Sequence, residues 1–296
     1  FVAGLEGGVR VSMDAGATWE QRNQGLPESG CYQLAASPAY AQDKTLYAAT
    51  PSGVHVSRDG PRTWHALPAF ATPARFVATG PGIVTAALEG SGLLASDDRG
   101  GAWRALPNAW AGAEVIGLAV SPAYARDRAI FVATAGSGEV VLWRSIDGGE
   151  RWQRWLVEPS GGLRHVPLAV ASTHAIDETV FVGVGPRVLR PLRDAREVRS
   201  GERRPIWRSA ELGQQTVAVT MLAASPGYGE DHAVFAASNA GVFVSRNGGE
   251  SFEPWNTGLN PARMVSVAVS PSYPHDGLVY GLGLGGGIWR RRDQRR

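Results

Sequence analysis

A motif of eight residues recurs along the chain and restricts its fold more than any other feature. Each copy begins with Ser, carries Asp or Asn two positions later, contains Gly, and ends with an aromatic residue. Trp19, Trp64 and Trp103 end three copies at intervals of 45 and 39 residues, close to the roughly 40–45-residue period of a four-stranded propeller blade. The five copies span residues 12–19, 57–64, 96–103, 145–152 and 245–252.

A second motif, Ser-Pro-x-Tyr-x-x-Asp, recurs between copies of the first. Its copies span 37–43, 121–127, 225–231 and 270–276, and 172–177 is a shorter, degraded copy. Proline fixes φ, and a short carboxylate can close a turn. We therefore predict that this motif connects the first two strands of a repeat.

Between the motifs lie short runs rich in β-branched and aromatic residues, bounded by Gly and Pro. One repeat reads as four strands at 33–36, 46–50, 53–57 and 63–67, and no segment has a sustained helical period. We predict an all-β fold, a single β-propeller domain over 1–296, with seven four-stranded blades, six as the alternative, and incomplete end blades. The predicted blades are 1–26, 27–68, 69–109, 110–158, 159–212, 213–259 and 260–296.

The acidic and aromatic residues of the first motif have a structural role in this interpretation. A short polar side chain accepts backbone N–H bonds within its own turn, and Gly allows positive φ there. The aromatic side chain then covers the gap between neighbouring blades. The residues assigned to this structural set are Asp14, Trp19, Asp59, Trp64, Asp98, Trp103, Asp147, Trp152, Asn247 and Phe252.

This motif resembles the Asp-box, or BNR, repeat of the sialidase-like propeller superfamily, and the likeness covers nearly the whole chain. That superfamily includes sialidases, xyloglucan-type glycosidases, sortilin-type receptors and propellers of the photosystem II assembly factor type. The resemblance implies the fold but no single activity, because many functions occur on this fold. It also implies an exported, periplasmic or cell-surface location. The sequence shows no signal peptide, but it begins at Phe1 rather than Met, so we expect a longer precursor.

In such relatives the ligand site lies around the axis, on the face opposite the Asp-boxes, which implies a site formed by the connections between blades. A sialidase would hold a carboxylate with arginines and use a Glu-assisted Tyr as nucleophile. The family's Arg-Ile-Pro signature is absent, however, and Arg75 is followed by Phe76 and Val77. The candidate ligand residues of this axial mouth are Tyr32, Arg75, Trp110, Glu114, Arg164, His165 and Arg263.

A glycoside hydrolase would need two carboxylates about 5–10 Å apart. The interblade connections contain Glu28, Glu114, Glu158 and Glu211, but a sequence does not give their separation. We assign no catalytic residue and predict a non-enzymatic binding or scaffold propeller for protein–protein interaction, with glycans as a further ligand class. The alternative is a carbohydrate-active glycoside hydrolase or sialidase-like enzyme that uses the interblade face.

In the fifth repeat an arginine-rich segment stands where the first motif is expected. It is longer than the equivalent turns, and long loops often carry function. Clustered guanidinium groups bind carboxylates and phosphates, and the resemblance implies the same use, because photosystem assembly propellers recognise their partner through an arginine patch. Asp194, Glu197 and Glu202 are interspersed, so a solvated loop is the alternative. The candidate partner-binding arginines are Arg187, Arg190, Arg193, Arg196, Arg199, Arg203, Arg204 and Arg208.

Composition argues against several other classes of function. The formal net charge is only +2, which gives no global field for nucleic acid, and stacking aromatics are not interleaved with the arginines. Cys31 is the only cysteine, so an internal disulfide is excluded, and six scattered histidines lack ligand spacing. We expect no cofactor, metal or membrane span, and an acidic protein as partner. The basic residues 290–292, 295 and 296 are expected to form a solvated tail.

Overall fold

The computed structural model describes residues 2–4, 8–14, 16–28, 30–70, 72–90, 92–199, 202–213, 217–259, 263–285 and 287–294, with the backbone alone at 2–4, 193–199 and 202–204. Backbone contacts divide the chain into two compact units, each of which is described by itself. Unit 1 comprises Phe1–Ser137 and Leu142–Arg154, and unit 2 comprises Gly138–Val141 and Trp155–Arg296.

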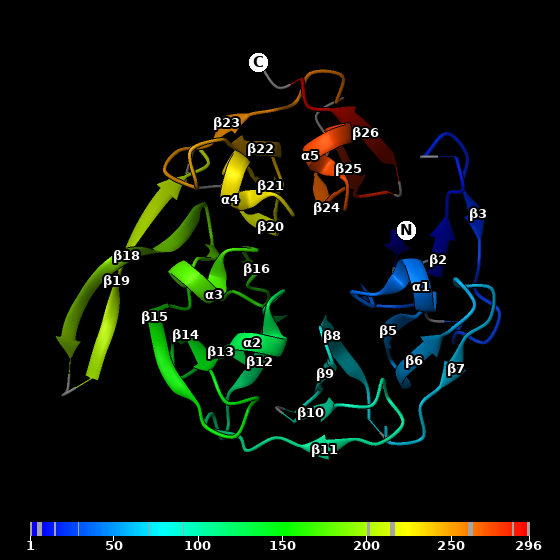
Figure 1. The fold of residues 1–296 in the computed structure, drawn as a ribbon, viewed down its shortest axis with the longest axis horizontal. Coiled ribbons are helices and arrows are strands. Elements are labelled where there is room, and N and C mark those ends of the chain that lie inside the picture. The colour runs from blue at the N-terminus through cyan, green and yellow to red at the C-terminus, as the bar shows by residue number, and fades with distance from the viewer. Residues whose placement is uncertain are drawn as a thin grey trace. The chain divides into compact units, whose positions relative to one another are not determined.

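Three sheets of unit 1 have their strands in chain order, with antiparallel neighbours (Figure 1). The first has only three described strands. The sheets are β1 (Val2–Gly4), β2 (Gly8–Val11) and β3 (Glu20–Gln21); β4 (Gln33–Ala36), β5 (Leu46–Thr50), β6 (Gly53–Ser57) and β7 (His65–Ala66); and β8 (Ala74–Gly80), β9 (Ile83–Leu88), β10 (Leu93–Ser96) and β11 (Arg104–Ala105).

A fourth sheet has residues in both units, and three more belong to unit 2, again in chain order. The last of these has three strands. The sheets are β12 (Glu114–Val120), β13 (Ile130–Gly136), β14 (Glu139–Ser145) and β15 (Gln153–Pro159); β16 (Leu168–Val170), β17 (Val180–Val184), β18 (Arg187–Arg199) and β19 (Glu202–Glu211); β20 (Val219–Ala224), β21 (Val234–Ser238), β22 (Gly241–Ser245) and β23 (Glu253–Pro254); and β24 (Met264–Val269), β25 (Leu278–Gly283) and β26 (Ile288–Arg292).

The Ser-Pro-x-Tyr-x-x-Asp connections each contain one turn of helix between the first and second strands of a sheet. In the first of them the hydroxyl of Ser37 donates to Asp43 at 2.7 Å, and Asp43 accepts the amide of Thr45 at 2.9 Å. The next residue, Lys44, has φ of 52° and ends the helix. The helices are α1 (Tyr40–Asp43), α2 (Tyr124–Asp127), α3 (His174–Asp177), α4 (Tyr228–Asp231) and α5 (Tyr273–Asp276).

The core lies between the faces of successive sheets. Every residue of β5 and β6 is buried, and so is every residue of β21 and β22. In unit 1, Tyr47 and Val56 of one sheet pack in a single cluster with Val77 and Val84 of the next. The first strand of the same sheet, β4, is only half-buried. Apolar area removed from water between sheets therefore holds consecutive blades together.

The fold is an all-β propeller, as predicted. Seven four-stranded blades are not observed, so that part of the prediction is wrong. Five sheets have four strands, and the sheets at the two ends of the described chain have three each. A count of six, our alternative, is reached when these two incomplete sheets are counted together.

Candidate functional site

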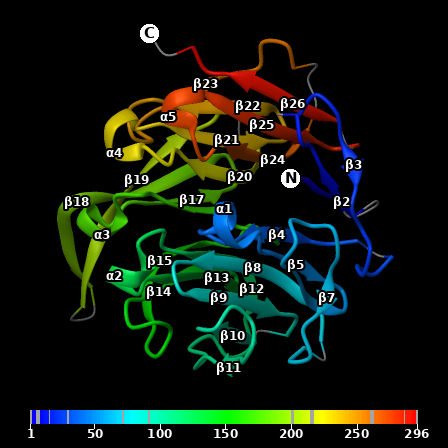
Figure 2. The same ribbon diagram turned by 45° about the vertical axis from the view of Figure 1, so that its right-hand side comes forward.

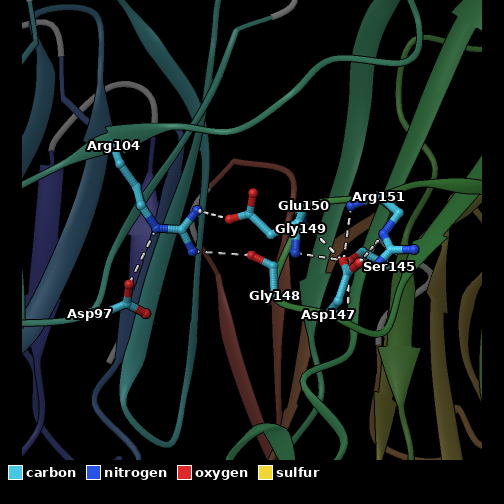
Figure 3. Close-up of polar contacts among 8 residues, drawn as sticks. All are labelled: Asp97, Arg104, Ser145, Asp147, Gly148, Gly149, Glu150 and Arg151. Carbon is cyan, nitrogen blue, oxygen red and sulfur yellow. Dashed lines mark hydrogen bonds and ion pairs between the residues drawn. The ribbon is translucent and has the colours of Figure 1, made fainter.

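The turn that contains Asp147 shows what the carboxylate of the first motif does (Figure 3). The hydroxyl of Ser145 donates to Asp147 Oδ1 at 2.9 Å and accepts the amide of Gly149 at 2.8 Å. The same carboxylate oxygen accepts the amides of Glu150 and Arg151 at 3.1 and 2.9 Å. These contacts direct the carboxylate into its own turn, so it closes the turn rather than facing a ligand.

Glycine is required at the centre of this turn. Gly149 has φ of +94°, and a Cβ atom there would lie 2.6 Å from Cδ1 of Leu106. A larger residue would be strained in its backbone and would also displace a core side chain.

Hydrogen bonding to these turn carboxylates shifts their titration. For Asp59, partial burial raises the pKa, but hydrogen bonds from the Thr63 hydroxyl and amide and from Ser57 outweigh burial and lower the pKa to about 2. The amide of Ala102, together with Ser96, lowers the pKa of Asp98. A general acid needs a raised pKa. The pKa values of these two carboxyl groups are lowered instead, which does not suit them to donate a proton.

An arginine from one sheet reaches the turn of the following sheet at several places. Arg104 Nη1 lies 2.9 Å from Glu150 Oε1, its Nη2 lies 3.2 Å from the carbonyl oxygen of Gly148, and its Nε lies 3.3 Å from Asp97 (Figure 3). We call such contacts arginine latches. The other latches join Arg58 to the carbonyl of Arg99 at 3.2 Å, Arg190 to Glu250 at 3.0 Å, and Arg246 to Asp293 at 2.7 Å.

In unit 1 the structure brings together two of the four predicted mouth residues. Arg75 and Glu114 form an ion pair at 3.3 Å, so each charge has a partner within the protein. Tyr32 is 45% exposed. Trp110 is only 3% exposed and packs edge-on against Trp152 with ring centroids 5.1 Å apart. This indole therefore packs in the core, and its role in lining a ligand site stays a prediction.

The other three predicted mouth residues belong to unit 2. Arg164 and Arg263 are exposed, and the ring of His165 is half-buried with Nε2 3.1 Å from the carbonyl oxygen of Thr220. Among the other loop glutamates, Glu158 forms an ion pair with Arg187 at 2.6 Å. Glu114 and Glu158 are therefore both held by arginine. In the described residues no group of His, Cys, Asp and Glu side chains could hold a metal ion.

The arginine-rich segment of the fifth repeat is a β-hairpin rather than an irregular loop (Figure 2). Strand β17 pairs with β18 only over Arg187–Leu189, whereas β18 continues to Arg199 and pairs with β19, with a shift of register between Pro191 and Arg196. Most of the hairpin therefore extends beyond the edge of its own sheet. Five of the eight candidates have side chains outside the described residues: Arg193, Arg196, Arg199, Arg203 and Arg204.

The described base of the hairpin is anchored at two points. Arg187 binds Glu158, and Arg190 binds Glu250 through one latch. Arg208 is exposed and lies directly across the ladder from Arg190. Two like charges at one register position destabilise an isolated hairpin, and the Glu250 carboxylate offsets that repulsion on one side. Of the three described candidates, only Arg208 stays exposed.

The structure has a hollow of about 660 Å³ beside β26 that the sequence analysis did not predict. Arg290, Arg291 and Arg292 belong to this strand, so the prediction of a solvated tail is wrong for them, and residues 295 and 296 lie outside the described part of the chain. Trp289 could have indicated a strand, because an aromatic residue in a short apolar run is typical of one. The lining residues are Arg246, Trp255, Arg290, Arg291, Arg292, Asp293 and Gln294.

No family model matches this chain, and no curated protein matches its sequence. Solved structures do resemble its fold. YCF48 from Cyanidioschyzon merolae aligns with a TM-score of 0.66 and 14% identity, over 97% of this chain and 88% of that protein. A chain of the mitotic checkpoint complex aligns with a TM-score of 0.60 and 12% identity, over 88% of this chain and 76% of the other.

An ancestral GH74 enzyme has a TM-score of 0.68 and 13% identity to this chain. The alignment covers 94% of this chain but only 41% of the enzyme, so this chain spans less than half of that protein. At such identities the likeness defines the class of protein, a β-propeller, and not an activity. No helix in the described part of the chain is long and apolar enough to cross a membrane.

Proposed function

We propose that this protein is a non-enzymatic propeller that binds acidic segments of other proteins through the β18–β19 hairpin. The observation that carries the proposal is the extension of this hairpin beyond β17, combined with eight arginines between positions 187 and 208. Beyond Leu189 the hairpin no longer pairs with β17. Clustered guanidinium groups on it would form charge-assisted, bidentate hydrogen bonds with carboxylates.

The ion pairs at the predicted mouth favour binding over hydrolysis. Glycoside hydrolysis needs one carboxylic acid to donate a proton and a second carboxylate as nucleophile or base. Glu114 and Glu158 are each bound to an arginine, so either carboxylate would have to leave an ion pair within the protein before it could act on a sugar. The mitotic checkpoint complex, which contains one of the similar structures, is a protein assembly, and a role in such an assembly is the type proposed here.

Binding of a fluorescent peptide of about ten glutamates, measured by anisotropy, tests the proposal directly. The test variant carries Arg196→Ser, Arg199→Ser and Arg203→Ser, and the matched control carries Arg10→Ser, Arg62→Ser and Arg126→Ser, which removes three exposed arginines elsewhere. We expect the hairpin variant to bind roughly tenfold more weakly, about 1.4 kcal/mol, and the control to lose little. Binding should also weaken with added salt. Equal losses in both variants would show that the hairpin is not the binding element.

We also propose an exported, periplasmic or cell-surface location, which rests on the superfamily resemblance. Fractionation of cells that produce the full-length gene product tests it, and recovery of the protein in the cytoplasmic fraction would contradict it.

A further inference from the structure

The third strand of the last sheet, β26, has an open edge in the described residues. In the preceding sheet, the fourth strand β23 pairs with the third strand β22 at Phe243↔Pro254 and Val244↔Glu253. In the last sheet β26 pairs with β25, and the sheet order ends there. Its outward backbone groups are therefore a template for one more antiparallel strand.

A recurring aromatic contact shows what an outer strand supplies in this fold. An indole in or just before an outer strand packs edge-on against an aromatic ring in or just after the outer strand of the preceding sheet. The ring centroids are 4.9–5.2 Å apart and the interplanar angles are 77–80°. The pairs are Trp103 on Phe70, Trp152 on Trp110, and Trp207 on Trp155.

The last of these pairs also includes a hydrogen bond between its two residues, and the last sheet offers a comparison. Trp207 Nε1 donates to the carbonyl oxygen of Trp155 at 3.2 Å. Trp255 lies three residues after Phe252, as Trp155 lies three residues after Trp152. The Trp255 ring packs on Trp289 of β26 with ring centroids 5.3 Å apart. In place of an outer-strand indole, the Arg291 guanidinium lies over Trp255 at 4.4 Å and donates to its carbonyl oxygen at 3.3 Å.

The hollow beside this strand is strongly basic. Four guanidinium groups and one carboxylate line it. The carboxylate, Asp293, is 3% exposed at its side chain and already binds Arg246 at 2.7 Å and the hydroxyl of Tyr273 at 2.5 Å. It is therefore neutralised within the protein, and Arg291 and Arg292 give the hollow its positive charge. Its volume of about 660 Å³ is in the range of small-molecule and peptide side-chain sites.

We propose that the open edge of β26 binds an extended acidic segment of a partner protein that carries one aromatic residue. The segment adds as a fourth strand, its aromatic ring takes the place of Arg291 on Trp255, and its carboxylates pair with Arg291 and Arg292. Main-chain hydrogen bonds supply affinity, and the aromatic and acidic positions supply specificity. This site is separate from the β18–β19 hairpin and is independent of its function.

The probe is a synthetic peptide of about ten residues, long enough to span β26, with one tryptophan between alternating valines and glutamates. Two control peptides replace the tryptophan by alanine or the glutamates by lysines. Calorimetric titration should show binding of the first peptide and roughly tenfold weaker binding of the alanine peptide. The lysine peptide should not bind. Amide hydrogen exchange should show new protection at Ile288–Arg292.

Variants distinguish specific binding at the edge of β26 from nonspecific electrostatic attraction of the peptide. Arg292→Glu should weaken binding of the peptide by about tenfold. Arg62 is an exposed arginine of unit 1, and Arg62→Glu should leave the affinity for the peptide unchanged. The hairpin variant with three serines should also bind normally, which distinguishes this inference from the proposed function. Equal binding of the tryptophan and alanine peptides, or protection away from β26, would overturn the proposal. A dimer of the free protein that Arg292→Glu dissociates would also overturn it, since the occupant would then be a second copy.

Discussion

Arg104 on the outer strand of one sheet binds Glu150 in the turn of the next sheet, with Nη1 and Oε1 2.9 Å apart (Figure 3). The same guanidinium also donates to the carbonyl oxygen of Gly148. In unit 2, Arg190 binds the turn residue Glu250 of the following sheet, and Arg246 binds Asp293 after β26. The abundance of arginine in this chain therefore has a structural component, since a planar guanidinium with several donors can bind a side chain and a backbone oxygen together.

We predict that this latch contributes modestly to the stability of the protein. Removing Arg104 should cost more stability than removing Glu150. The side chains of Arg104 and Glu150 are 36% and 59% exposed, so solvent screens their attraction and the pair itself should contribute about 0.2–1 kcal/mol. Arg104→Ala should cost more than Glu150→Ala because it also removes the bond to Gly148. A double-mutant cycle by urea unfolding measures the coupling energy. A coupling well above about 1 kcal/mol, or one insensitive to salt, would contradict this assignment.

We predict that Asp147→Ala destabilises the protein by about 1.5–3 kcal/mol, because it leaves the Ser145 hydroxyl and two amides without their charged acceptor. Asp147→Asn should cost less, since Asn247 accepts the equivalent bonds from Ser245 and Ser251. Urea unfolding of both variants checks the order. Equal losses would show that the charge, and not the acceptor oxygen, stabilises the turn.

The strands and turns of this fold were predictable because their signals are local. The predicted strands 46–50 and 53–57 coincide with β5 and β6, since β-branched residues, glycine turns and the recurrent motif all indicate the same structure. The one-turn helices were not predicted. Tyr40–Asp43 is too short to show a helical period, and its conformation is fixed by the bond from Ser37 to Asp43 and by the αL residue Lys44.

The site was less predictable because it depends on which residues meet in space. Trp110 stands in an interblade connection, where an aromatic residue can equally line a ligand site or fill the core. The decisive contact is with Trp152, which lies more than forty residues further along the chain. In the same way, nothing in the sequence pairs Arg75 with Glu114, and the hollow beside β26 depends on Trp255 from the neighbouring sheet.

We predict that Trp110→Ala destabilises unit 1 by about 3–5 kcal/mol, the usual cost of removing a large buried aromatic side chain. Trp110 also contacts Trp143, so the cavity would be lined by two further indoles. Trp110→Phe should recover much of the loss. Thermal and urea unfolding followed by tryptophan fluorescence measure both variants. A ligand-lining Trp110 would instead tolerate alanine with little change in stability.

We predict that the Cys31 thiol is unreactive in the folded protein. The residue is 1% exposed, and burial raises the pKa of the Cys31 thiol to about 12, so almost no thiolate is present near neutral pH. A thiol reagent such as 5,5′-dithiobis(2-nitrobenzoate) should label the protein only as it unfolds, and labelling in urea should follow the unfolding curve. Fast stoichiometric labelling without denaturant would contradict the buried position.

We predict that His55 makes the protein less stable below neutral pH. Its ring is 4% exposed, Nδ1 lies 3.3 Å from the Thr50 hydroxyl, and burial lowers the pKa of His55 below the ordinary value of 6.5. The unfolded chain therefore binds a proton that the folded protein resists. The stabilisation is complete above about pH 6.5 and falls as the pH drops towards the lowered pKa.

Urea unfolding at about pH 7 and about pH 5 tests this sign. The wild type should lose more stability between the two pH values than His55→Gln, which has no imidazole to protonate at this position. The exposed His65 provides the control, and His65→Gln should keep the pH dependence of the wild type. If His55→Gln loses as much stability as the wild type between the two pH values, the imidazole of His55 is not the group responsible. The acid sensitivity would then have to come from another titrating group, because turn carboxylates such as Asp98, whose pKa is lowered in the folded state, lose their stabilising contribution only below about pH 5.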